Sequence, residues 1–132
     1  MEVVGLTNLE QLKQAIMSYG DKILFAYLFG SAAAGSGGSM SDIDLAVYFN
    51  SHRRDCQMMR IDLYVALSRA LRRNDLDIVI LNTASNLVLV DNIIRHGVLI
   101  VDRGRELRES YELKVLHRAI DFKAHRKRWM GI

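Results

Sequence analysis

The chain of 132 residues contains no proline and only one cysteine, Cys56. A lone cysteine excludes an internal disulfide, and with it the disulfide-rich secreted domains, and it suggests a reducing compartment. The longest apolar stretch, residues 87–101, is interrupted by polar side chains and falls short of the roughly 18 residues that a membrane span needs. The first residues, 1–5, lack the basic segment of a signal peptide. We therefore expect a cytoplasmic location and no membrane partner.

The net charge of +3 is spread unevenly along the chain. Residues 103–132 contain nine Lys or Arg and four Asp or Glu, whereas residues 1–102 contain nine and eleven. The basic segment lacks the interleaved aromatic side chains and the motifs of nucleic-acid-binding proteins, so we expect no direct nucleic-acid binding. The four histidines are scattered without the spacing of zinc ligands.

Apolar residues make up 50% of the chain, which is enough for one core. We expect a single domain over 1–132, in which 103–132 is a C-terminal basic helix. A capping box at 7–10, helical spacing after it and a stop at Gly20 predict a first helix. Similar spacing predicts helices over 53–73, 85–95 and 105–128. Short apolar runs predict strands over 23–29, 45–49, 76–81 and 98–101, and the first of these, apolar throughout, should be central in its sheet.

The apolar positions of the last predicted helix lie on more than one face; they are Leu107, Tyr111, Leu113, Leu116, Ile120 and Phe122. A helix with two apolar stripes at the end of a small domain is expected to pack one stripe on the body and the other on a partner.

Two acidic residues, Asp42 and Asp44, open the second predicted strand. Side chains alternate between the faces of a strand, so both carboxylates should point the same way, with their Cα atoms about 6.6 Å apart. Two like charges this close at the edge of an apolar strand are costly unless a cation pairs with them. Magnesium fits this position, because it takes hard oxygen ligands and shares them with substrate phosphates.

A glycine-rich segment, residues 30–38, joins the first two predicted strands. Gly30 has no Cβ and lets the backbone approach a ligand closely. Ser31 offers a hydroxyl and a backbone N–H at the expected start of a short helix, where phosphate groups bind well. An ordinary turn would also use glycine and serine, and the two downstream aspartates favour phosphate binding over that simpler explanation.

Together these residues carry a resemblance. Gly30-Ser31, ten further residues and then Asp42-Ile43-Asp44 resemble the signature of the DNA polymerase beta-like nucleotidyltransferase superfamily. The short chain length and the sequence Ser-Asp-Ile-Asp-Leu are similar to those of its minimal nucleotidyltransferases, which are the antitoxin partners of HEPN toxins. The resemblance implies an α/β (α+β) fold with a small mixed sheet flanked by helices. Many relatives carry a basic residue where this chain has Ala34.

A third acid, Asp77, follows at the head of the third predicted strand. Taken alone, it is explained more simply as a strand-end residue exposed to water. The superfamily, however, carries a third carboxylate on the strand beside the Asp-x-Asp strand, and Asp77 matches that place better than Asp75, which is the alternative. The resemblance thus makes Asp42, Asp44 and Asp77 the catalytic and metal-binding residues, and Gly30 and Ser31 the residues that bind ATP.

What the resemblance implies for function is specific. The chain would be the antitoxin of a type VII-like HEPN/MNT toxin–antitoxin pair, a magnesium-dependent protein adenylyltransferase. It would move AMP from ATP to a hydroxyl of its cognate HEPN ribonuclease toxin, with tyrosine the expected acceptor, and so block the toxin. Two alternatives stay open: an antitoxin that acts by binding alone, with an inactive site, and a nucleotidyltransferase for a small molecule such as an aminoglycoside.

Overall fold

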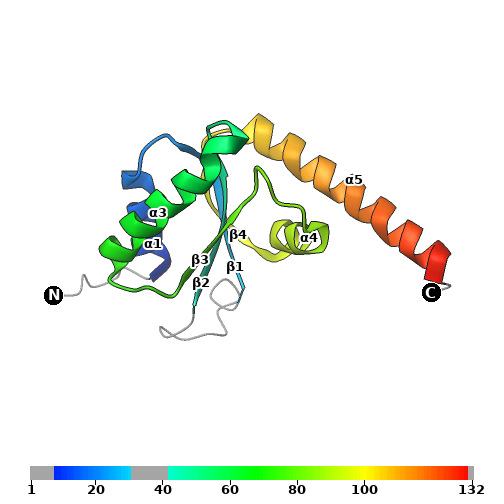
Figure 1. Cartoon of the computed structure of the whole chain (residues 1–132), viewed down its shortest axis with the longest axis horizontal. Helices are drawn as coiled ribbons and strands as arrows, with labels where there is room; N and C mark the ends of the chain where they lie inside the picture. The colour runs from blue at the N-terminus through cyan, green and yellow to red at the C-terminus, as the bar shows by residue number, and fades with distance from the viewer. Residues whose placement is uncertain (1–7, 31–41, 131–132) are drawn as a thin grey trace.

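The computed structural model describes residues 8–30 and 42–130, and only the backbone of Asn8 and of residues 126–130. Strands and helices follow one another along these residues, as the apolar patterns predict (Figure 1). The elements are α1 (Asn8–Ser18), β1 (Ile23–Phe29), β2 (Ile43–Phe49), the short 3-10 helix η1 (Arg53–Asp55), α3 (Cys56–Leu71), β3 (Leu76–Ile80), α4 (Leu87–His96), β4 (Val98–Asp102) and α5 (Arg105–Met130).

The four strands form one mixed sheet in the order β3-β2-β1-β4. Strand β1 pairs antiparallel with both β2 and β4, whereas β2 and β3 run parallel. The central place of β1 confirms the prediction from its unbroken apolar sequence, since most of its side chains are buried. The mixed sheet with flanking helices also confirms the fold class that the resemblance implied.

Helices cover both faces of the sheet, so an apolar core lies on each side of it. Figure 1 shows α1 and α3 on one side of the sheet and α4 and α5 on the other. The α1–α3 layer packs Leu12, Ile16, Leu63 and Leu67 against the sheet. The α4–α5 layer packs Val90, Ile93 and Val115 against the other face. No helix in the described part of the chain is both long and apolar enough to cross a bilayer.

The second predicted helix differs in detail from the observed one. It begins as η1 and continues as α3 only to Leu71, because Arg72 adopts a left-handed conformation, with φ 54° and ψ 44°, and ends the helix. Met59 packs against the core, whereas the side chain of Met58 is 63% exposed.

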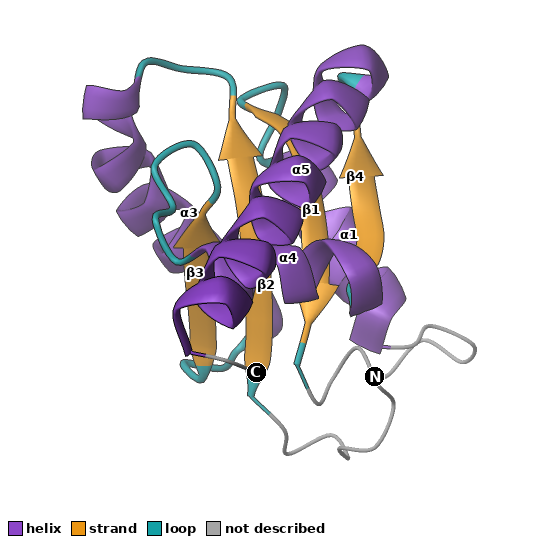
Figure 2. Cartoon of the chain, turned by 90° about the vertical axis from the view of Figure 1, so that its right-hand side faces the viewer, coloured by secondary structure: helices purple, strands orange, loops and turns teal. Residues whose placement is uncertain are grey.

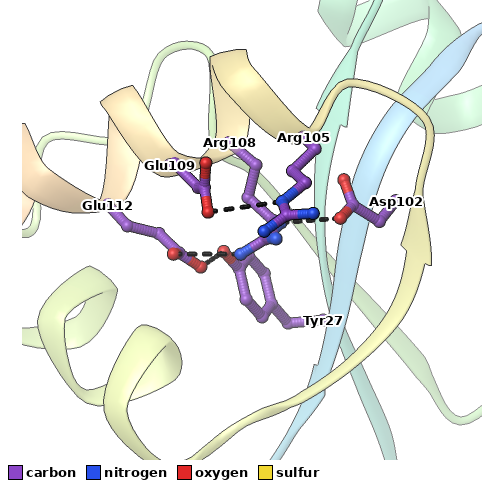
Figure 3. A network of polar contacts seen from close by, with 6 residues as sticks. All are labelled: Tyr27, Asp102, Arg105, Arg108, Glu109 and Glu112. Atoms are coloured by element: carbon purple, nitrogen blue, oxygen red, sulfur yellow. Dashed lines mark hydrogen bonds and ion pairs between the residues drawn. The ribbon is translucent and has the colours of Figure 1, made fainter.

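The first turns of α5 are fixed to the sheet by a polar network around Arg108 (Figure 3). The Arg108 guanidinium donates from Nε to Asp102 Oδ2 at 3.0 Å and from Nη1 to Glu112 Oε1 at 3.1 Å. The Tyr27 hydroxyl, from β1, donates to the other oxygen of Glu112. Burial, followed by this hydrogen bond, raises the pKa of Tyr27 far above its ordinary value. The network therefore connects the start of α5 to the centre of the sheet.

Candidate active site

The three predicted acids lie on neighbouring strands at one end of the sheet. Asp44 is the second residue of β2 and Asp77 the second residue of β3, and the parallel register pairs them directly. Residues paired in this way project from the same face of a sheet. Asp42 immediately precedes β2 and is exposed. The chain thus brings together carboxylates that are more than thirty residues apart in sequence.

The electrostatics of Asp44 show that these carboxylates act on one another. Partial burial raises the pKa of Asp44, and the charges of Asp77 and then Asp42 raise it further. Among the described residues, no Lys or Arg forms an ion pair with any of the three. No ion pair within the described part of the protein therefore balances the charge of this cluster. A cluster of carboxylates without such a partner favours the binding of a cation.

Asp75, the alternative third acid, is already paired. Its carboxylate accepts two hydrogen bonds from Arg73, at 2.6 Å and 2.5 Å, and these bonds lower its pKa. The charge of Asp42 also acts on the Arg73 guanidinium. Sequence reasoning did not single out Arg73 among the arginines; its position two residues before an acid was the only signal.

Gly30, at the end of β1, lies directly against the acidic cluster. Its φ of +78° is one that side chains rarely adopt. A Cβ at this position would meet the Asp44 carboxylate, with the carboxyl carbon only 3.3 Å away. Glycine is thus needed here for both its conformation and its lack of a side chain. Ser31 and Ala34 lie outside the described residues.

A magnesium ion fits the chemistry of this cluster. Within the described ranges, no three His, Cys, Asp or Glu side chains form a group that could hold a metal by themselves. Magnesium does not require such a cage, because it is usually held by one or two carboxylates together with substrate phosphates and water. The excess negative charge around Asp44 and the oxygen donors of Asp42 and Asp44 match this mode of binding.

Several solved structures with a similar fold come from toxin–antitoxin complexes. One chain of a toxin–antitoxin crystal structure with AMP-PNP is 26% identical, with a TM-score of 0.73, and the match covers 95% of this chain and 97% of that one. A chain from the complex of the tri-AMPylated Shewanella oneidensis HEPN toxin with its MNT antitoxin is 25% identical, with a TM-score of 0.66 and coverages of 94% and 93%. A chain of the toxin–antitoxin MntA–HepT is 24% identical, with a TM-score of 0.66 and coverages of 94% and 94%, and supports the fold alone.

The family comparison covers the part of the chain that contains the predicted site. No curated protein matches the chain. The family model described as Polymerase beta, Nucleotidyltransferase matches residues 10–106, which include Gly30 and all three carboxylates. The chain therefore belongs to the polymerase beta nucleotidyltransferase family.

Proposed function

We propose that this chain is the antitoxin of a HEPN/MNT toxin–antitoxin pair and that it transfers AMP from ATP to a hydroxyl of its toxin. The observation that carries the proposal is the cluster of Asp42, Asp44 and Asp77 beside Gly30, at the end of the sheet, in a chain of a nucleotidyltransferase family. Two similar structures support the choice of substrates, because one contains AMP-PNP and the other an AMPylated HEPN toxin.

In this proposal Asp42 and Asp44 would hold magnesium together with the phosphates of ATP, which Gly30 and Ser31 would bind. Magnesium bound there would offset negative charge on the α-phosphate and on the leaving pyrophosphate. Gly30 leaves room for the phosphates, since a side chain would occupy the space beside the Asp44 carboxylate. The predicted role of Asp77 depends on its place beside Asp44 in the register of the two strands.

The transfer step has a defined balance. The acceptor oxygen attacks the α-phosphorus in line, a new phosphorus–oxygen bond forms, and the bond to the bridging oxygen of pyrophosphate breaks. The proton of the attacking hydroxyl passes to the Asp77 carboxylate, which is exposed and therefore accessible to an acceptor. A tyrosine acceptor, with an ordinary pKa of about 10, needs this assistance at neutral pH.

The modification would block the toxin through bulk and charge. An AMP group adds a phosphate to a surface that binds RNA, whose backbone is also negatively charged, so RNA binding should weaken. We place this reaction in the cytoplasm, where ATP is abundant and where the free thiol of buried Cys56 would persist.

The test is transfer of label from ATP labelled at its α-phosphate to the purified HEPN protein encoded beside this chain, with magnesium present. The wild-type chain should label the toxin at a hydroxyl side chain and inhibit its ribonuclease activity. Asp42→Asn and Asp44→Asn should remove the label, whereas Asp75→Asn, which replaces a nearby acid paired with Arg73, should keep most of it. If the unlabelled toxin is inhibited equally by the wild type and by Asp44→Asn, the chain acts by binding alone and the proposal is wrong.

A further inference from the structure

The distal half of α5, residues 113–130, packs on the body of the protein through Val115 and Ala119. In Figure 1 the helix begins near one end of the sheet and runs away from it, and in Figures 1 and 2 its C-terminal end lies level with the opposite end of the strands. Its last buried described side chain is Ala119, and every described side chain from Ile120 to His125 is exposed. The Arg108 network holds the first turns, and beyond them Val115 and Ala119 are buried and Lys123 pairs with Asp91 of α4.

Two apolar stripes run along this half of the helix. Val115 and Ala119 are buried, and Phe122 lines an open groove of about 540 Å³ between α4 and α5. Leu113, Leu116 and Ile120 recur at helical spacing on the other side and form what we call the outer stripe. Leu113 and Ile120 are 54% and 53% exposed, in contrast to the buried pair.

The charge of α5 changes at the same point. Residues 103–112 contain three Lys or Arg and three Asp or Glu, whereas residues 113–132 contain six and one. Beyond Ile120, Lys123 pairs with Asp91 of α4, with 3.9 Å between Nζ and Oδ2, so it faces the groove between the two helices and not the outer stripe. Because this half of α5 is basic overall, a protein surface that covers the outer stripe should present apolar side chains with acidic ones around them.

The family comparison separates α5 from the catalytic part of the chain. The family model ends at residue 106, the second residue of α5, so the helix lies outside what it describes. The match to the structure with AMP-PNP covers 95% of the 132 residues, more than the part that precedes Arg105, and so extends into α5. The similarity to the toxin–antitoxin structure thus includes part of α5, whereas the match to the nucleotidyltransferase family does not depend on this helix.

We propose that the outer stripe of α5 is the surface on which the toxin docks, so that its acceptor hydroxyl reaches the Asp42–Asp44–Asp77 cluster. This inference rests on the proposed function, which supplies the partner. In Figure 2 the C-terminal end of α5 lies level with the end of β1 and the start of β2, where Gly30 and the acidic cluster are. A toxin segment along the stripe would therefore extend toward that end of the molecule. A second copy of this chain fits less well, because two halves with the same positive charge would repel each other. Nucleic acid would leave the aliphatic side chains unburied.

The test compares two double variants of the full chain. Leu113→Ser with Ile120→Ser removes two exposed side chains from the outer stripe. Met58→Ser with Ile61→Ser removes two exposed side chains from α3, on the opposite side of the sheet, where they are 63% and 44% exposed. The stripe variant should bind the purified toxin about tenfold to a hundredfold more weakly, since central apolar contacts dominate such interfaces. The α3 variant should bind like the wild type.

Activity measurements separate this inference from the proposed function. In the stripe variant KM for the toxin should rise while kcat at saturating toxin and the affinity for magnesium–ATP stay unchanged. Equal toxin affinity in the stripe variant and the wild type overturns the docking surface, even if AMP transfer is intact. The docking surface is also overturned if the stripe variant loses self-association or RNA binding while it still binds the toxin like the wild type. Weaker toxin binding without any AMP transfer by the wild type supports the surface and overturns the proposed function.

Discussion

The molecule contains two acidic clusters that differ in what balances their charge. Asp102 and Glu112 face Arg108, which bonds to both. Asp42, Asp44 and Asp77 have no ion pair in the described structure, and partial burial, followed by the charges of Asp77 and Asp42, raises the pKa of Asp44. Acids paired by an arginine stabilise a fold, whereas acids held together without such a partner are prepared for a cation from outside. The comparison therefore separates the carboxylates that hold the fold together from those that we propose bind a cation.

The largest expected effect is on activity at the unpaired cluster. Asp44→Asn should lower AMP transfer about a thousandfold, because a bound metal ion contributes several kcal/mol to stabilising the transition state. The chain should still fold, which thermal unfolding would check. Glu109→Gln, in an exposed pair with Arg105, is the matched control and should keep full activity. If Asp44→Asn does not fold and the wild-type chain binds no magnesium, Asp44 has a structural role instead.

Gly30 offers the next largest effect. Gly30→Ala should lower activity about a hundredfold, because its Cβ would displace the Asp44 carboxylate. It should also cost about 1–2 kcal/mol of stability, measured by urea unfolding, because of the positive φ. Gly20→Ala is the control: Gly20 also has a positive φ, of +106°, but a Cβ there meets nothing within 4 Å. If both variants lose stability and both keep activity, the contact with Asp44 has no role in catalysis.

The paired cluster should show the opposite behaviour. Arg108→Ala should cost about 2–3 kcal/mol in the free energy of unfolding, since it leaves two partly buried carboxylates without their hydrogen bonds. Arg105→Ala should change stability by less than about 0.5 kcal/mol, since its pair with Glu109 is 3.4 Å long and exposed. Figure 3 shows both arginines on the same turns of α5. Equal effects of the two variants would remove the distinction.

The smallest expected effect is on how stability varies with pH in the absence of divalent ions. The folded pKa of Asp44 is raised above its ordinary 3.8, so its contribution to stability falls as the pH rises from 3.8 through the folded pKa. The folded pKa of Asp75 is lowered, so its contribution is present above 3.8 and is lost as the pH falls through that lowered value. Urea unfolding between pH 3 and 7 should show that Asp44→Asn removes the first dependence and Asp75→Asn the second. If the difference in stability between the wild type and Asp44→Asn instead moved in favour of the wild type as the pH rises, the raised pKa of Asp44 would be contradicted.

Much of the fold could be predicted from the sequence because local patterns determined it. The unbroken apolar run 23–29 gave the bounds of β1, and acids at the heads of two strands indicated the site. The bond between Tyr27 and Glu112 could not be predicted, because it joins positions 85 residues apart. Val115, which is buried, was missed among the apolar positions of the last helix, since several faces of that helix carry apolar residues. The roles of Gly30, Ser31, Asp42, Asp44 and Asp77 stay predictions.

The most direct test of the central claim is calorimetric titration of a non-hydrolysable ATP analogue into the chain with magnesium and with a chelator. The unpaired cluster should bind the analogue only when magnesium is present, and Asp42→Asn or Asp44→Asn should abolish that dependence together with most of the affinity. Asp75→Asn should bind like the wild type. Binding that is equally strong with the chelator, or unchanged by both substitutions, would contradict the claim that these carboxylates hold a divalent ion on ATP.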